Sequence, residues 1–273
     1  MRYKRVINKT MNYILLPAFN EKKNLIKVFE KIDKITKKIK GITVVLVDDC
    51  SSDNTILLKN KKYKFKLIYT RHKKNLGLSL TMETGFKLIF NKARDIDTVV
   101  TLDSDNTHPI SKIPKMIKKI QTGSDIVIAS RFVKSSKVNG LTLWRHFLSI
   151  GAKHLFKLFY PYNNLNDYTC NFRAYKFELI QDILKNKKFF KNEDFNIAAK
   201  IILFLTGRNN NLKISEIPFT LSYDYKIGQS KMKLTKTILF IYLLALIFLT
   251  FSSKSDLQSS SWPLYFVACL DTL

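Results

Sequence analysis

Cysteine is scarce in this chain of 273 residues: there are three, Cys50, Cys170 and Cys269, and they stand far apart. None of them forms a CxxC pair or lies at a cysteine–histidine spacing that would suit zinc. The sequence therefore argues against a disulfide framework and against a zinc site. Isolated thiols of this kind fit a reducing compartment.

Acidic residues are also few, because 21 Asp and Glu stand against 47 Lys and Arg, a formal net charge of +26. Such an excess has three usual partners: nucleic acid, an anionic membrane surface or small polyanionic substrates. Recognised nucleic-acid motifs are absent, which argues against a nucleic-acid partner. A further interpretation is that many lysines are solvated surface residues with no specific partner.

An export signal is absent as well, since residues 1–12 are basic and contain no apolar stretch suited to export. We therefore expect the chain to begin and remain on the cytoplasmic side. Internal repeats and low-complexity linkers are missing too. With 46% hydrophobic residues, the chain is long enough for one large domain with a sizeable core, or for one domain plus a short appendix.

Short apolar runs alternate with helical patterns along the first half of the chain. Leu25, Phe29 and Ile32 recur at helical spacing in a segment that Gly41 ends, and a second helix is predicted over residues 79–93. Strands are predicted over residues 13–17, 42–47, 66–70, 98–102 and 125–130. This alternation predicts an α/β fold with a mostly parallel, Rossmann-like sheet.

Polar residues follow three of the predicted strands directly. They are Asn20 and Glu21 after the first strand, Asp48 and Asp49 after the second, and Asp103 and Asp105 after the fourth. In a mostly parallel sheet, ligands bind in the crevice beyond the carboxyl ends of the strands. We therefore expect these three loops to line one ligand-binding crevice.

Asp103 and Asp105 are the strongest metal-binding candidates. Two carboxylates one residue apart at a strand end can converge on one hard cation, Mg²⁺ or Mn²⁺, with diphosphate oxygens completing its coordination shell. Such a cation would neutralise the charge that builds up on a departing nucleoside diphosphate. The alternative is a solvated turn in which an aspartate caps the next helix, but the other acidic loops at the same edge favour the metal.

Three further polar segments each have two interpretations. Asp49 can bond a base N–H or ribose hydroxyls, or its loop can be an Asx-rich turn that ends in a helix cap. Arg131 follows a strand and suits a phosphate. In residues 167–175, Asp167 and Arg173 can form a pair that is purely structural. Residues 228–231 (GQSK) can form a flap over phosphates, or a basic turn beside a membrane.

The second half of the chain is richer in aromatic residues. Residues 144–162 suit an interfacial amphipathic helix, with Arg145, Lys153 and Lys157 beside its apolar face. The alternative is a core-packing helix with a basic outer edge.

The C-terminal part contains an uncharged apolar run, residues 237–251, shorter than the ~20 residues that comfortably span a bilayer. Lysines precede this run, and positive charge beside a hydrophobic segment favours the cytoplasmic side. We therefore expect a catalytic domain over residues 1–232 and a hydrophobic, membrane-associated segment over residues 233–273 with C-terminal amphipathic or hydrophobic helices.

Eight motifs occur in a characteristic order over residues 13–232: LLPAFNEKKNL, VVLVDDCSSDNT, NLGLSLTMETGF, TLDSDNTHP, DIVIASRF, NDYTCNFRAY, EIPF and YKIGQSKM. In this order the chain resembles family 2 glycosyltransferases, which have the GT-A fold of nucleotide-diphospho-sugar transferases. Within that family it is most similar to dolichol- and polyprenyl-phosphate mannose synthases.

The resemblance implies a role for particular residues. The nucleotide would be contacted by Pro17, Phe19, Glu21, Val47 and Asp49. The rest of the donor would be contacted by Asp103 and Ser104, and the metal by Asp105, with Asp103 and Thr107 beside it. Arg131 and Lys231 would hold the donor diphosphate or the acceptor phosphate. Asp103, Asp105 and Arg131 are thus the catalytic residues that the resemblance implies.

Several positions differ from the usual pattern of that family. Phe19 stands where tyrosine is frequent, and Thr107 where glutamine is often found. In the flap, Tyr225 takes the position of an arginine, with Lys226 one residue further on. Residues 197–202 (IAAKII) contain no acidic residue where one is often present.

The missing acid bears on mechanism, because a sugar hydroxyl acceptor needs a general base, whereas a lipid phosphate is already anionic near neutral pH. We therefore predict an inverting transfer of a sugar, mannose in the first place, from a nucleotide-sugar such as GDP-mannose to polyprenyl or dolichyl phosphate. The reaction would take place at the cytoplasmic face of a membrane. A phosphate oxygen would displace the nucleoside diphosphate in line, and the protein's share would be positioning and electrostatic stabilisation.

Alternative functions stay open from the sequence. A polyprenyl-phosphate glucose synthase or a glycan-extending transferase of the same family would use the same motifs. A non-enzymatic, basic peripheral membrane-binding protein would explain the charge and the apolar segments alone. Assembly into a homo-oligomer is also left open.

Overall fold

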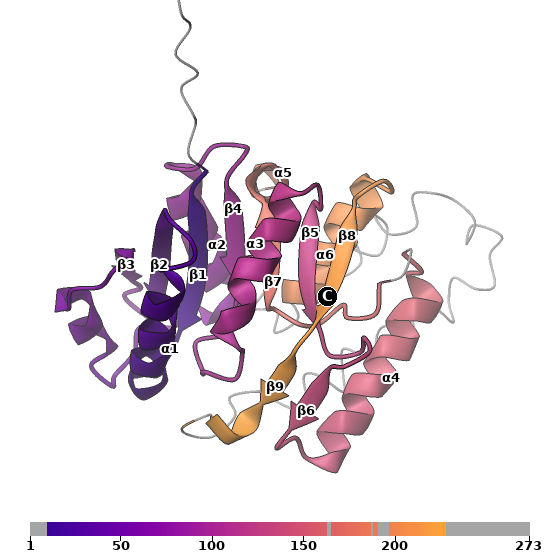
Figure 1. The fold of residues 1–273 in the computed structure, drawn as a ribbon, viewed down its shortest axis with the longest axis horizontal. Helices are drawn as coiled ribbons and strands as arrows, with labels where there is room; N and C mark the ends of the chain where they lie inside the picture. Colours follow the sequence, from indigo (N-terminus) through magenta and orange to yellow (C-terminus); the bar gives the residue numbers. More distant parts are fainter. Residues whose placement is uncertain (1–9, 163–164, 187, 191–196, 226, 228–273) are drawn as a thin grey trace, which may run out of the picture.

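A seven-stranded sheet forms the centre of the computed structural model (Figure 1), which describes residues 10–162, 165–186, 188–190, 197–225 and 227. The strand order is β3-β2-β1-β4-β7-β5-β8. The strands are β1 (Asn12–Ala18), β2 (Ile42–Asp48), β3 (Lys66–Arg71), β4 (Thr98–Thr101), β5 (Ile126–Ser130), β7 (Arg173–Lys176) and β8 (Ile214–Pro218). A second small sheet pairs β6 (Lys137–Asn139) with β9 (Thr220–Ser222) in parallel.

Helices cover both faces of the large sheet (Figure 1). They are α1 (Lys22–Ile35), α2 (Gly77–Phe90), α3 (Ile113–Gln121), α4 (Leu143–Phe159), α5 (Phe177–Lys185) and α6 (Ile197–Arg208). Short 3-10 turns lie at η1 (Thr55–Asn60), η2 (Ile110–Lys112) and η3 (Tyr223–Tyr225). The packing clusters put α1 and α3 on one face, and α2, α5 and α6 on the other.

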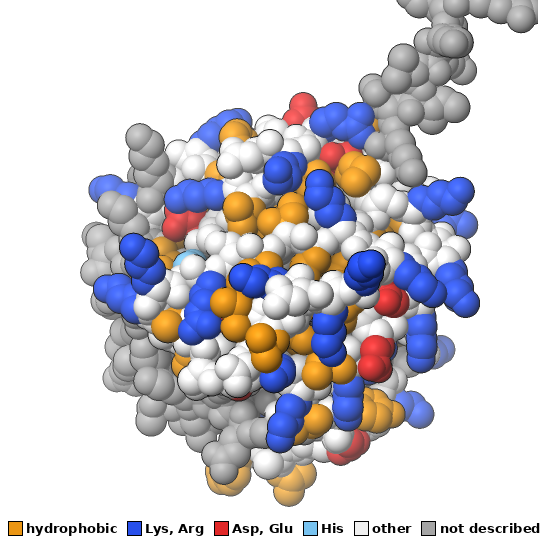
Figure 2. Space-filling view, turned by 90° about the vertical axis from the view of Figure 1, so that its left-hand side faces the viewer, with side chains coloured by type: hydrophobic (Ala, Val, Ile, Leu, Met, Phe, Trp, Pro, Cys, Tyr) orange, Lys and Arg blue, Asp and Glu red, His pale blue; other side chains and the backbone are white. Residues whose placement is uncertain are grey.

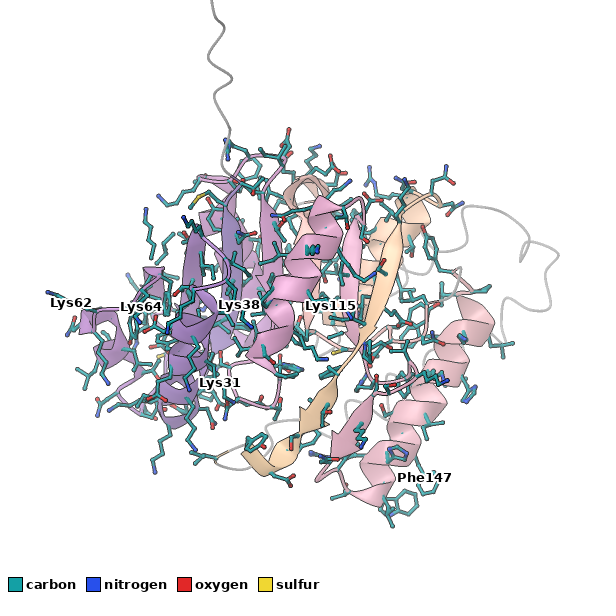
Figure 3. All side chains as sticks on the ribbon, viewed as in Figure 1. Lys31, Lys38, Lys62, Lys64, Lys115 and Phe147 are labelled. Carbon is teal, nitrogen blue, oxygen red and sulfur yellow. The ribbon has the colours of Figure 1, made fainter. Side chains whose placement is uncertain are left out.

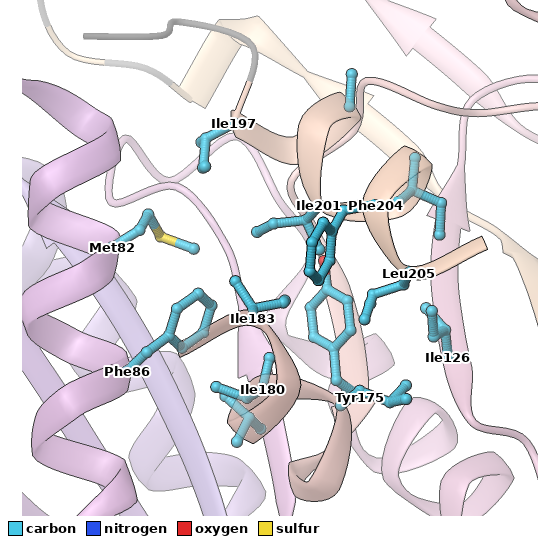
Figure 4. Packing of buried hydrophobic residues seen from close by; sticks show 14 of the residues in the cluster. Met82, Phe86, Ile126, Tyr175, Ile180, Ile183, Ile197, Ile201, Phe204 and Leu205 are labelled. Carbon is cyan, nitrogen blue, oxygen red and sulfur yellow. The ribbon is translucent and has the colours of Figure 1, made fainter. Parts of the chain in front are cut away.

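Alternation along the strands explains why this sheet is covered on both sides. In β1, Tyr13 and Leu15 belong to the cluster with α2, α5 and α6, while Ile14 and Leu16 belong to the cluster with α1 and α3. All seven residues of β1 and all seven of β2 are buried, so both strands appear in the sequence as continuous apolar runs. Figure 4 shows the first cluster, where side chains of α2, α5 and α6 meet Tyr175 of β7.

The predicted mostly parallel α/β sheet is confirmed, and each predicted strand is present with shifts of a residue or so at its ends. Strand β7 is the exception, because it runs antiparallel to both of its neighbours, β4 and β5. The sequence analysis did not predict it. Its four residues, RAYK, are too short a run to show strand alternation and include a charged residue at each end.

Two expectations about the C-terminal part concern residues outside the described ones. The proposed division at residue 232 and the apolar run 237–251 both lie in 228–273, which the structure does not describe. Among the described residues, no helix combines the length and the apolar character needed to cross a bilayer.

Positive charge is spread widely over the surface. Figure 2 shows one face of the molecule, on which lysine and arginine side chains are scattered between apolar ones rather than gathered in one patch. This distribution fits solvated surface lysines on that face.

Gly85 allows α2 to lie directly on β1. A Cβ at position 85 would overlap Cδ1 of Leu15 and lie 2.9 Å from its Cδ2, and Leu15 is fully buried. We therefore expect Gly85→Ala to lower the free energy of unfolding by about 1–3 kcal/mol, as overpacked cores do. Urea unfolding followed by circular dichroism measures this.

Gly151 in α4 provides the matched control, because no atom lies within 4 Å of a Cβ added there. Gly151→Ala should raise the free energy of unfolding by up to ~1 kcal/mol, the difference in helix propensity. Stabilisation by both substitutions would contradict the close packing of α2 on β1.

Candidate active site

The loops after β1, β2 and β4 are hydrogen-bonded to one another at the carboxyl edge of the sheet. The backbone N–H of Asp49 donates to the carbonyl of Ala18 at 2.8 Å. The hydroxyl of Ser104 donates to the carbonyl of Pro17 at 2.7 Å. A third bond, from the N–H of Asn20 to Oγ of Ser51 at 2.8 Å, closes the connection. The expectation that these loops meet at one edge is therefore confirmed.

The Asp103–Asp105 loop is held by its neighbours. The N–H of Asp103 donates to Nδ1 of His108 at 3.3 Å, and Nδ2 of Asn171 donates to Oδ1 of Asp103 at 3.1 Å. Thr107 donates both its hydroxyl, at 2.7 Å, and its N–H, at 3.2 Å, to Oδ1 of Asp105. Both aspartates remain half-buried, so their carboxylates are oriented yet still reach solvent.

The donor set fits a divalent cation that is shared with a ligand. Among the described residues, no group of three or more His, Cys, Asp or Glu could hold a metal ion. Of the described residues, Asp103 and Asp105 would contribute their carboxylates, and Mg²⁺ is usually bound by one or two carboxylates in this way, with substrate phosphates as other ligands. The hydroxyl of Thr107 donates to Asp105 and therefore helps to orient that carboxylate. Its direct contact with a metal stays a prediction.

Asp49 is buried, and its carboxylate accepts three hydrogen bonds. The N–H of Leu76 and Nδ1 of His72 bond Oδ1 at 2.8 and 2.7 Å, and the N–H of Gly77 bonds Oδ2 at 2.9 Å. This side chain thus satisfies the N–H of Leu76, directly before α2, and the N–H of Gly77, the first residue of α2. Asp48, which is fully buried, accepts instead from the N–H of Ser51 and the hydroxyl of Tyr69.

The loop after β2 forms the Asx-rich turn that one interpretation of its sequence predicted. Asp53 accepts from the N–H and hydroxyl of Thr55, as an Asx turn requires, and also from the N–H of Lys22 at the start of α1. Asp48 and Asp53 shape the loop. Whether Asp49 binds a ligand in addition stays a prediction.

The remaining predicted nucleotide contacts differ in their exposure. Glu21 is nearly buried and accepts from Nδ2 of Asn24 at 2.6 Å. Phe19 is 36% exposed, while Val47 is fully buried in the core beneath the loops. Pro17 is buried too, with its carbonyl bonded to Ser104. Any contact of Val47 with a nucleotide would therefore involve the end of its strand rather than its side chain.

Arg131 and Asp167 form a bidentate ion pair at the end of β5. Nε and Nη2 of Arg131 donate to the two carboxylate oxygens at 2.8 and 2.7 Å, and Nη2 also donates to the hydroxyl of Thr169. Burial alone would raise the pKa of Asp167, but the Arg131 guanidinium outweighs it and holds that pKa below its ordinary value. A structural ion pair exists here, with Arg131 rather than Arg173 as the partner of Asp167.

Arg173 has a separate structural role. It is fully buried in β7 and donates to the carbonyls of Ala198 and Tyr168. In Arg131, whose side chain is 16% exposed, the hydrogen bonds to described residues come from Nε and Nη2 rather than from Nη1. The predicted phosphate contact itself is not tested.

The backbone that leads toward the predicted flap is fastened to α1. Asn24 accepts from the N–H of Ile227 at 3.1 Å and donates to its carbonyl at 3.0 Å. Lys31 (Figure 3) donates to Oδ1 of Asn106 at 2.6 Å and lies 5.4 Å from the ring centroid of Tyr225. Lys231 lies outside the described residues, so its contact with phosphate stays a prediction.

Sequence reasoning missed Tyr223 as a residue of this site. Burial raises the pKa of the Tyr223 hydroxyl, and Arg131, Asp103, Asp105 and Arg145 all lie close enough to act on it electrostatically. These charged groups belong to two different strand-end loops and to α4, so no local pattern could have brought them together. Asn171, which orients Asp103, was missed for the same reason.

The Arg131–Asp167 pair predicts a specific dependence of stability on pH. Asp167→Asn should lower the free energy of unfolding at pH 7 by about 3–5 kcal/mol, since a buried guanidinium loses its charged partner. The folded pKa of Asp167 is depressed, so its stabilisation is fully present above the unfolded pKa of ~3.9 and is lost as pH falls through the folded pKa. The difference in free energy of unfolding between wild type and Asp167→Asn, measured by urea unfolding, should become smaller below about pH 4.

Asp182→Asn is the control, because Asp182 is 50% exposed and pairs only with Lys185 on the surface. It should change stability by less than ~1 kcal/mol at every pH. A difference between wild type and Asp167→Asn that stays constant down to pH 3 would contradict the depressed pKa.

A mostly parallel α/β sheet whose carboxyl edge carries an Asp-x-Asp loop defines the GT-A class of nucleotide-diphospho-sugar transferases. The chain belongs to the glycosyl transferase family 2, whose model matches residues 13–184. The fold agrees, since glucosyl-3-phosphoglycerate synthase from Mycobacterium tuberculosis superposes with a TM-score of 0.57 at 15% identity, covering 88% of this chain and 79% of that one.

Two curated relatives match most of the chain. A dolichol-phosphate mannosyltransferase from Pyrococcus furiosus is 33% identical over 224 residues, which is 81% of this chain and 58% of the relative. This chain therefore spans little more than half the length of that protein. A polyprenol monophosphomannose synthase from Mycolicibacterium smegmatis is 24% identical over 224 residues, 80% of each chain.

Proposed function

We propose that this chain is an inverting glycosyltransferase that moves mannose from a nucleotide-sugar, GDP-mannose in the first place, to a polyprenyl or dolichyl phosphate. One observation carries the proposal: Asp103 and Asp105 leave the end of β4 half-buried, oriented by Asn171 and Thr107, at the same edge of the sheet as the loop of Asp49. The acceptor class follows from the two relatives, whose names specify dolichol phosphate and polyprenol.

The donor would lie along the edge that these loops form. Its nucleoside would lie near Phe19, Glu21 and Asp49, and its diphosphate near Asp103 and Asp105. A bound Mg²⁺ or Mn²⁺ would supply neutralisation of the negative charge on the departing diphosphate. Ser104 would fix the position of this loop, because its hydroxyl is bonded to the carbonyl of Pro17.

The reaction is a single displacement. An oxygen of the lipid phosphate forms a bond to the anomeric carbon, the bond from that carbon to the diphosphate breaks, and the nucleoside diphosphate leaves with the electron pair. The configuration at the anomeric carbon inverts. Arg131 contributes positive charge near this point, and its orientation is fixed by Asp167, so little reorganisation is needed during the transfer.

A general base is not required for this acceptor. The phosphate is already anionic near neutral pH, and helix α6 has no acidic residue along its length. A sugar-hydroxyl acceptor would need such a base.

Helix α4 is the element that we assign to the membrane. Its residues Leu143, Trp144, Phe147 and Leu158 are 77, 78, 65 and 66% exposed. Figure 3 shows Phe147 projecting outward from α4. Phe156, by contrast, is buried and stacks on Tyr168 with ring centroids 5.1 Å apart. One side of α4 therefore anchors in the core, and the other presents apolar side chains with Lys153 and Lys157 at their border, as interfacial helices do. Arg145 lies instead on the side that is close to Tyr223.

The metal prediction is tested with Asp105→Asn. This change should abolish metal-dependent transfer of labelled sugar to chloroform-soluble lipid while leaving the melting temperature nearly unchanged, because a half-buried carboxylate is replaced by an isosteric amide. GDP-mannose, UDP-glucose and UDP-N-acetylglucosamine are supplied in parallel with membrane lipid extract and Mg²⁺ or Mn²⁺. The donor that labels the lipid identifies the sugar.

Asp95→Asn is the matched control, since Asp95 is an exposed aspartate at the opposite edge of β4, bonded to Gln181. It should retain full activity. Full activity of Asp105→Asn, or of wild type in excess chelator, would refute the metal site. Absence of lipid labelling with every donor would refute the proposed reaction.

The membrane prediction is tested with the double variant Trp144→Ser/Phe147→Ser. Co-sedimentation with vesicles that contain anionic phospholipid should fall by at least about tenfold, because burying each large apolar side chain contributes about 1.5–3 kcal/mol. Transfer to long-chain lipid phosphate should fall much more than transfer to a short, water-soluble analogue.

Phe90→Ser is the control, since Phe90 is an aromatic residue of α2 that is 49% exposed and lies away from α4. It should leave vesicle binding unchanged. An equal loss of transfer with both acceptors in the α4 variant would show that this face serves folding rather than access to the bilayer.

A further inference from the structure

His72 is a buried histidine that no step of the proposed reaction uses. It follows β3 directly, its side chain is 10% exposed, and its backbone N–H donates to the carbonyl of Asp48 at 2.9 Å. Both ring nitrogens have partners: Nδ1 lies 2.7 Å from Oδ1 of Asp49, and Nε2 lies 2.9 Å from Oγ1 of Thr84 in α2. The two hydrogen bonds, one at each ring nitrogen, fix the orientation of the ring.

The bond to Asp49 requires the hydrogen on Nδ1, because a carboxylate only accepts. The hydroxyl of Thr84 can then bond Nε2 whether the ring is neutral or protonated. Its hydroxyl donates to a neutral ring, or accepts from a protonated one. The chain Thr84–His72–Asp49 therefore keeps the donor directed at Asp49 whichever charge the ring carries.

The count of acceptor positions on Asp49 shows what remains for a ligand. A carboxylate offers about four lone-pair sites, two on each oxygen. Oδ1 uses both, for Leu76 and His72, and Oδ2 uses one, for Gly77. Counting contacts with the described residues, one acceptor position remains, on Oδ2, and the three bonds determine its direction.

We propose that His72 is a positioning residue for recognition of the donor's base, acting through Asp49. This inference rests on the proposed function, in which Asp49 lies beside the nucleoside. A single acceptor of fixed direction suits a base that presents a ring N–H, as guanine and uracil do. Adenine and cytosine present a ring acceptor at that position and donate from an exocyclic amino group, which lies elsewhere on the base. Without His72, Oδ1 loses its side-chain partner, and only the N–H groups of Leu76 and Gly77 hold the carboxylate. The remaining acceptor is then directed less firmly.

The test measures equilibrium binding of GDP, UDP and ADP, and of inorganic diphosphate, to the full chain in the presence of Mn²⁺. His72→Ala should weaken GDP or UDP by about tenfold, the effect expected for disturbing one hydrogen bond to a charged group. Inorganic diphosphate, which has no base, should bind as before. In turnover assays the donor KM should rise while kcat at saturating donor stays near wild type.

Rescue distinguishes positioning from a general structural role. His72→Asn places an N–H near the position of Nδ1 and should restore most of the affinity, whereas His72→Gln places its amide near Nε2 and should not. Thr84→Val should give a smaller loss of base affinity. Its control is Thr81→Val, one turn earlier in α2, since the Thr81 hydroxyl bonds only the carbonyl of Gly77.

A double variant tests whether His72 acts through Asp49. In an Asp49→Ala background, His72→Ala should cause no further loss of GDP or UDP affinity, whereas independent roles would give additive losses. Wild-type affinity in His72→Ala, or equal weakening of inorganic diphosphate, would overturn the inference. Failure of the wild-type chain to bind any nucleoside diphosphate would instead refute the proposed function, so the two failures are distinct.

Discussion

The parallel pairing of β1 with both β2 and β4 is the constraint on which the rest of the site depends. In register, Ala18 lies beside Asp48 on one side, and Leu15 lies beside Thr101 on the other. The three strands therefore end close together, and their polar loops bond one another rather than water alone. Without this register, Asp49 and the Asp103–Asp105 loop would be separate turns with no shared ligand.

Strand β7 brings Asn171 and Asp167 to the site, which the parallel strands alone would not do. Because it runs antiparallel between β4 and β5, the chain that enters it passes the carboxyl ends of both neighbours. Asn171 is thereby placed against Asp103, and Asp167 against Arg131. The reversed strand orients residues of the site that lie on its two neighbours.

The aspartates divide into two groups according to how completely the protein satisfies them. Asp48 and Asp167 are fully buried, and each accepts hydrogen bonds both from its own loop and from a neighbouring segment, so they hold the chain in place. Asp103 and Asp105 are only half-buried, and in a chain with a net charge of +26 they are the carboxylates that a cation at this edge would meet. Asp49 lies between these groups, with most of its acceptor positions used and one left.

The sequence by itself was sufficient for the strands that are apolar and buried on both faces, for the polar loops at their carboxyl ends, and for the family. Those features depend on local hydrophobicity and on motif order, which are present in the chain before it folds. It was insufficient for β7, for the choice of Arg131 over Arg173 as the partner of Asp167, and for the exposure of Trp144 and Phe147. Each of these depends on which distant segments become neighbours, and only the tertiary structure decides that, because hydrogen bonds and burial are formed in space rather than along the sequence.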